Sequence, residues 1–130
     1  MEDKNIKERC KIDNKYKWNI IAMFPQEEKW DETIQIVLEE TEKYKSFAGK
    51  LTKNGATLYA AFQDKDDIWQ KLEKVFVYAR MRLDEDNTVT KYQSMFDKCN
   101  TIISNVSASM SFFTPELLEA SDKRLLSLIN

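Results

Sequence analysis

The sequence predicts an all-α fold, a helical bundle of four or more helices preceded by an extended amino-terminal arm. Only two glycines and two prolines occur among 130 residues, whereas an all-β domain needs turn residues every ~8–12 positions. Apolar residues also recur in steps of three and four over long stretches, which is the spacing of one helix face. A chain of this length is expected to form a single domain, covering residues 1–130.

The arm should cover residues 1–25, where no period is sustained, and its apolar carboxyl end should pack onto the helices. A first helix should begin at Pro25, because proline suits the first helical turn and Glu27 and Glu28 then lie at the positive end of the helix dipole. Gly49 should follow its end. The apolar face of this helix comprises Trp30, Ile34, Val37, Leu38 and Tyr44.

Two further helices are expected in the middle of the chain. A short one should cover residues 56–63, and the polar segment 64–67 should then cap the start of the next. That third helix should end at residues 84–87, which form a polar turn between helices. Its apolar stripe comprises Ile68, Leu72, Val75, Phe76, Ala79 and Leu83.

The fourth helix has the strongest apolar pattern and should run ~37 Å from residue 89 to 113 at 1.5 Å per residue. Its stripe should pack on that of the third helix. Small hydroxyl residues flank the stripe, which favours packing within one chain over a homomeric coiled coil. Thr114 and Pro115 should begin a short fifth helix reaching residue 120, and Ser121 another. The fourth stripe comprises Val89, Tyr92, Phe96, Cys99, Ile103, Val106, Met110 and Phe113.

Composition excludes several functional classes. The net charge is −2, with the two signs interleaved, so no basic surface for nucleic acid is indicated. The first residues are polar and no run of ~18 apolar residues occurs, which argues against export and membrane insertion. Cys10 and Cys99 lack the spacing of a disulfide framework or zinc knuckle. We therefore expect a compact cytoplasmic protein with reduced thiols.

Catalytic chemistry has little support in this chain. Because there is no histidine, neither an HExxH zinc site nor a histidine-activated nucleophile is available. No cofactor is expected in this chain, and we assign no catalytic or metal-binding residue. Asp84, Glu85 and Asp86 could hold a cation weakly, but the same residue types end and cap helices, which is the favoured interpretation. No phosphate-binding glycine loop is present.

Two weaker features bear on binding. Arg80 and Arg82 could hold a peptide carboxylate in a guanidinium fork, although a solvated helix end with cations against its dipole is the favoured interpretation. A recognition platform could be formed by Tyr16, Lys17 and Trp18 with Phe24 and Trp30, although aromatic residues near a chain start more often cover a core.

Several short segments occur in a characteristic order. RCKI at 9–12 precedes YKWNI at 16–20, with Phe24-Pro25 and Trp30 after them. Tyr44-Lys45 and Gly49-Lys50-Leu51 follow, then YARMRLDED at 78–86 and SFFTPELL at 111–118. In their order and spacing these segments resemble the opening of oligoendopeptidase F proteins, in the thimet oligopeptidase-like superfamily.

The resemblance implies a parent activity and a place within it. Family members are cytosolic zinc metallopeptidases that hydrolyse short peptides, and this region is a helical domain that walls the substrate channel beside a later HExxH domain. We therefore predict that this chain is the non-catalytic amino-terminal domain, with the zinc-binding catalytic domain absent. Its partners would be the remainder of the peptidase chain and, only with that remainder, a peptide substrate. The alternative is a free-standing helical protein–protein interaction module.

Apolar residues at the two ends of the chain are the candidate interface. A completed domain more often tapers into polar residues, so we interpret the apolar carboxyl end as part of a longer protein. A domain built to lie against a larger body should keep an apolar face, which a homodimer could cover. The candidates are Trp18, Phe24, Leu125, Leu126, Leu128 and Ile129.

Overall fold

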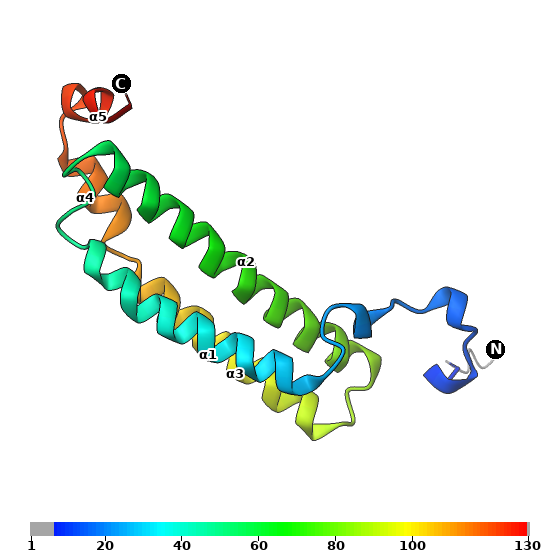
Figure 1. The fold of residues 1–130 in the computed structure, drawn as a ribbon. Helices are drawn as coiled ribbons and strands as arrows, with labels where there is room; N and C mark the ends of the chain where they lie inside the picture. Colours follow the sequence, from blue (N-terminus) through cyan, green and yellow to red (C-terminus); the bar gives the residue numbers. More distant parts are fainter. Residues whose placement is uncertain (1–6, 130) are drawn as a thin grey trace, which may run out of the picture.

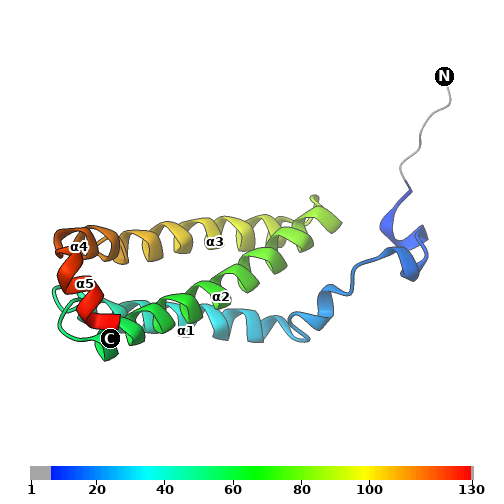
Figure 2. The same ribbon diagram turned by 90° about the horizontal axis from the view of Figure 1, so that it is seen from above.

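The computed structural model describes residues 7–129, and within that range it contains helices and no strand. The first six residues of the predicted arm and Asn130 lie outside the described residues. Three long helices lie side by side, and two short ones lie together at one end of the bundle (Figures 1 and 2). The predicted all-α bundle is confirmed. The helices are α1 (Glu27–Tyr44), α2 (Gly55–Glu85), α3 (Thr90–Ser109), α4 (Phe113–Glu119) and α5 (Asp122–Ile129).

Helix α1 follows the prediction, starting two residues after Pro25, with Glu27 and Glu28 in its first turn. Its inner face is buried against α2, and the indole Nε1 of Trp30 donates a hydrogen bond of 2.8 Å to the carbonyl oxygen of Val75. After α1 the chain makes one turn of 3₁₀ helix and reverses at Gly49, whose φ of +75° is a conformation that suits glycine.

The break predicted at residues 64–67 is wrong, because α2 runs unbroken from Gly55 to Glu85. The buried positions Ala61 and Ile68 lie seven residues apart, so they share one helix face. Lys65 fills the position between them, and its Nζ lies 4.8 Å from the ring centroid of Phe113. Its methylene stem thus continues the apolar stripe, while neighbouring aspartates stay exposed on a solvated face.

Helix α3 is shorter than predicted, and its buried face is wider than the predicted stripe, although Cys99 and Val106 are buried as expected. It ends at Ser109 rather than continuing to Phe113. Met95 and Ile102 are buried, whereas the predicted core residue Ile103 is only half-buried. The reason is that α3 packs against two helices: its Phe96 ring contacts α2, while Lys98 pairs with Asp31 of α1. A single stripe could not describe a helix with two neighbours.

The two short helices close one end of the bundle. The predicted cap at Thr114 is wrong, because α4 already begins at Phe113. The cap at Ser121 is present, since its Oγ accepts a hydrogen bond from the Arg124 backbone N–H at 3.2 Å. The Arg124 guanidinium donates to the carbonyl oxygens of Thr52 and Lys53 and so joins α5 to the loop before α2.

The described part of the arm contains three 3₁₀ turns, Arg9–Lys11, Asn14–Tyr16 and Ile20–Ala22. Its carboxyl end enters the core through Ile20 and Phe24, which are both 4% exposed. The preceding residues lead away from the bundle beyond the carboxyl end of α2 (Figures 1 and 2). Between the arm and the carboxyl end of α2 lies a groove lined by side chains of both.

Candidate functional site

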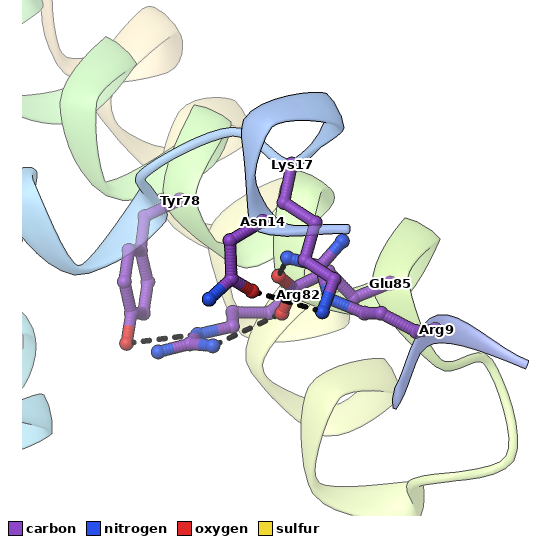
Figure 3. Close-up of polar contacts among 6 residues, drawn as sticks. All are labelled: Arg9, Asn14, Lys17, Tyr78, Arg82 and Glu85. Atoms are coloured by element: carbon purple, nitrogen blue, oxygen red, sulfur yellow. Dashed lines mark hydrogen bonds and ion pairs between the residues drawn. The ribbon is translucent and has the colours of Figure 1, made fainter. Parts of the chain in front are cut away.

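The groove between the arm and the carboxyl end of α2, here called the arm groove, is the most developed polar site in the described part of the chain. It has a volume of ≈ 460 Å³. Both elements contribute side chains, which Figure 3 shows converging. It is lined by Arg9, Asn14, Lys17, Trp18, Asn19, Ile20, Ile21, Arg82 and Glu85.

Helix α2 supplies one wall of the groove through residues spaced along one face. Tyr78, Arg82 and Glu85 follow one another at four and three residues, which places them on adjacent turns. The Arg82 Nε donates to the Tyr78 hydroxyl at 3.2 Å, and its Nη1 donates to the Glu85 carboxylate at 3.0 Å. Burial opposes the charge of Arg82, but these two hydrogen bonds outweigh it and raise its pKa.

The arm supplies the opposite wall. Arg9 forms an ion pair with Glu85, so that this carboxylate lies between two guanidinium groups (Figure 3). The Asp13 carboxylate caps the second 3₁₀ turn by accepting from the Lys15 backbone N–H at 3.1 Å. This turn presents Lys17, whose Nζ donates to Asn14 Oδ1 at 3.2 Å.

The groove lining carries three cations, Arg9, Lys17 and Arg82, against the single carboxylate of Glu85. The Arg82–Glu85 pair is the more enclosed part, with side chains 19% and 12% exposed, while the Arg9 side chain is 39% exposed. Partial burial weakens solvent screening, so the excess positive charge favours an anionic ligand. The arrangement can therefore hold an anion through charge-assisted hydrogen bonds.

A second, apolar hollow continues the groove. It is lined by Trp18, Asn19, Ile20, Met23 and Met81, and its volume is ≈ 440 Å³. The first three of these residues also line the arm groove, so the charged and apolar hollows adjoin. Together they can accept a molecule that has an anionic end and an apolar side.

The predicted interface residues do not come together. Trp18 is 80% exposed at the groove, whereas Phe24 lies in the core with its ring edge-on to Tyr78 at 5.2 Å, so Phe24 belongs to the internal packing of the chain. The other four candidates are on α5, at the far end of the bundle from the arm (Figure 1). Among these, Leu126 is 61% and Ile129 is 80% exposed, while Leu125 and Leu128 are half-buried.

Arg80 and Arg82, which the sequence analysis considered together as one carboxylate-binding fork, have different surroundings in the structure. Arg80 matches the favoured interpretation, since it is exposed and forms an ion pair of 3.0 Å with Asp84 one turn away. Arg82 differs, because it faces the arm. The acidic turn ends α2 at Glu85, but no side chain of it caps α3, which begins at Thr90. Asp86 instead accepts hydrogen bonds from the Thr88 side chain and backbone within the turn, and both lower the Asp86 pKa.

Sequence comparison identifies the relatives of this chain. It is 32% identical over 121 residues to group B oligopeptidase PepB of Streptococcus agalactiae, which is 93% of this chain and 20% of that protein. It is 26% identical over 122 residues to oligopeptidase PepF of Bacillus subtilis, and 29% identical over 119 residues to the chromosomal oligoendopeptidase F of Lactococcus lactis subsp. cremoris. The chain is homologous to oligoendopeptidase F proteins.

The homology to oligoendopeptidase F proteins is confined to their amino-terminal region. The alignment with PepF takes in 94% of this chain but 18% of PepF. The alignment with the chromosomal Lactococcus protein takes in 91% of this chain but 20% of that protein. It thus spans about a fifth of the curated relatives it matches. No family model and no solved structure matches it.

The segments that carry the oligoendopeptidase F resemblance supply five residues of the arm groove, of which only Arg9 had not been considered for a binding role from its own sequence context. Arg9, Lys17 and Trp18 lie in two of these segments, and Arg82 and Glu85 lie in a third. All five line the arm groove, although the arm and α2 segments are far apart in sequence. Their clustering was not predicted, because an arm without regular spacing gives no indication of which residues share a face.

The described residues do not fit the zinc ion that the oligoendopeptidase F resemblance implies for the parent protein. Within residues 7–129 no group of three potential ligands is close enough to hold a metal ion. The two cysteines are free, with Cys10 exposed and Cys99 buried in the core. Burial raises the pKa of the Cys99 thiol to about 11, which disfavours the thiolate that zinc requires. In the same range, no helix is both long and apolar enough to cross a membrane.

Proposed function

We propose that this chain is the amino-terminal helical domain of an oligoendopeptidase F-like peptidase, and that it has no catalytic activity of its own. The observation that supports this most strongly is the alignment, which takes in 93% of this chain but only 20% of the oligopeptidase PepB. The parent reaction would be hydrolysis of short peptides, as the names of the relatives indicate. Zinc would be bound by residues elsewhere in the parent protein, because this sequence contains no histidine.

The more specific role that we propose is to wall the substrate channel of that peptidase. Three long helices packed side by side would supply such a wall, because close-packed interiors resist deformation. The surface that faces the rest of the peptidase would include large apolar side chains left exposed on the helices. These include Ile36, Tyr59, Phe62 and Val77, which are 44%, 64%, 43% and 42% exposed.

Absence of intrinsic activity is tested on the chain alone. The purified chain is incubated with zinc and a quenched fluorescent oligopeptide, with full-length Bacillus subtilis PepF as the positive control. The expected result is no cleavage above the buffer rate. Cleavage that is abolished by a metal chelator and co-purifies with the chain would contradict the proposal.

The alternative is a free-standing interaction module, which the exposed Leu118 and Ile129 side chains, at 79% and 80%, would serve equally well. The same surface could bind a partner helix or a second copy. Light scattering at micromolar concentration measures the molar mass and so shows whether the chain binds a second copy of itself. A dimer that Ile129→Glu separates without unfolding would favour the module, whereas a monomer at all concentrations leaves covering by the parent peptidase as the explanation.

A further inference from the structure

The cations of the arm are not all partnered by carboxylates. Along the arm, Lys11 pairs with Glu8 at 3.0 Å and Lys15 pairs with Asp13 at 3.6 Å. Lys17 instead contacts the neutral amide oxygen of Asn14. Within residues 7–129 the structure therefore leaves the Lys17 charge without a neutralising carboxylate.

The arginines add to this charge. The Glu85 carboxylate contacts Arg9 through Oε1 and Arg82 through Oε2, so one negative charge faces two guanidinium groups and one positive charge is left over. Arg9 is the more exposed of the two and has N–H donors beyond the one directed at Glu85. A guanidinium and an ammonium at one side of a groove form a binding site for a carboxylate.

The apolar hollow limits which carboxylate fits. Trp18 and Met81 line both it and a third, smaller hollow that also includes Arg9 and Glu85. An apolar side chain in this hollow would thus lie directly beside the charged end of the groove. Inorganic anions and nucleotides present no such side chain next to the charge, whereas the last residue of a peptide carries both.

We propose that the arm groove binds the free carboxyl terminus of a peptide, with Arg9 and Lys17 on the carboxylate and the terminal side chain against Trp18 and Met81. The choice of a peptide rather than another amphipathic carboxylate rests on the proposed function. Binding itself does not, because it is measured on this chain alone and without any cleavage step.

The test compares two peptides that differ only at the carboxyl terminus. Acetyl-Ala-Leu-Leu as the free acid and as the amide are titrated into the ¹⁵N-labelled chain at low salt, and amide and indole shifts are followed by NMR. The free acid should bind saturably, with shifts at Lys17 and Trp18, and the amide should bind about tenfold more weakly or not at all, which is the loss of one strong ion pair. Equal binding of the two peptides, or no saturable shift with either, would overturn the proposal.

Single substitutions show whether peptide affinity depends on the cations of the groove or on the overall surface charge. Lys17→Gln leaves the Arg9–Glu85 ion pair in place and should weaken free-acid binding about fivefold. Arg9→Gln should do the same, provided that far-UV circular dichroism shows the helices intact. The matched controls Lys15→Gln and Arg80→Gln remove equal charge outside the groove and should leave affinity within about twofold. If the controls weaken binding as much as the groove variants, the site is not specific.

Inorganic phosphate is the competing probe. It should displace the free-acid peptide only when present in large excess, because it cannot fill the hollow beside Trp18. Displacement by phosphate at equal concentration would show a simple anion site and would overturn the assignment to a peptide.

Discussion

Glu116 joins the short helix α4 to the loop between α1 and α2, and its removal should be costly. Its carboxylate accepts hydrogen bonds from the backbone N–H groups of Gly49 at 2.7 Å and of Leu51 at 2.8 Å. Leu51 is fully buried, so that bond should contribute about 2 kcal/mol, and the exposed bond to Gly49 about 1 kcal/mol. Glu116→Ala should therefore lower the free energy of unfolding by ~2–3 kcal/mol.

Urea unfolding followed by circular dichroism at 222 nm measures this loss, which corresponds to a midpoint shift on the order of 1 M for a typical slope. Glu116→Gln keeps one acceptor oxygen but loses the charge, so its loss should fall between wild type and Glu116→Ala. Glu119→Ala, on the exposed side of the same helix, is the matched control and should change stability by less than about 0.5 kcal/mol. A loss below about 0.5 kcal/mol for Glu116→Ala would refute the reasoning.

Three further changes test the core. The Tyr44 hydroxyl is buried and has no hydrogen-bond partner among the described residues, so Tyr44→Phe should leave thermal stability unchanged or raise it by up to ~1 kcal/mol; a loss above that size would reveal an unrecognised partner. Burial raises the Cys99 pKa from 9.0 to about 11, so the neutral thiol is favoured in the folded state and stability should fall as pH rises from 9 through 11. Cys99→Ala should flatten that decline, and iodoacetamide should modify Cys10 in the folded chain but Cys99 only after unfolding. Ile102→Ala should cost ~2–5 kcal/mol in chemical denaturation, and Ile103→Ala clearly less, because only Ile102 is buried.

Helical spacing predicted most of the fold, because an amphipathic helix carries its packing direction in its own sequence. The inner face of α1 from Trp30 to Tyr44 is buried as expected. Prediction failed where one residue type serves two purposes. The aspartates of residues 64–67 match a helix cap, yet here they lie on the solvated face of α2, and the stem of Lys65 completes the stripe.

The site was less predictable than the fold. Arg82 could be placed on a helix surface, but which helix surface the arm would cross depends on contacts such as Phe24 with Tyr78, which no local pattern contains. Arg9 and Lys17 lie in 3₁₀ turns and extended residues, where there is no fixed period to assign a face. The resemblance covers the segments that contain these residues, but it did not predict that they meet in one groove.

The most direct measurement of the central claim is a domain exchange in a relative. The region of Bacillus subtilis PepF that aligns with this chain is deleted in one variant and replaced by this chain in another, and the chelator-sensitive kcat/KM on an oligopeptide is determined for each. The account predicts that the deletion variant is inactive and that the exchange variant recovers measurable activity, while this chain alone has none. A folded exchange variant that is no more active than the deletion variant would contradict it.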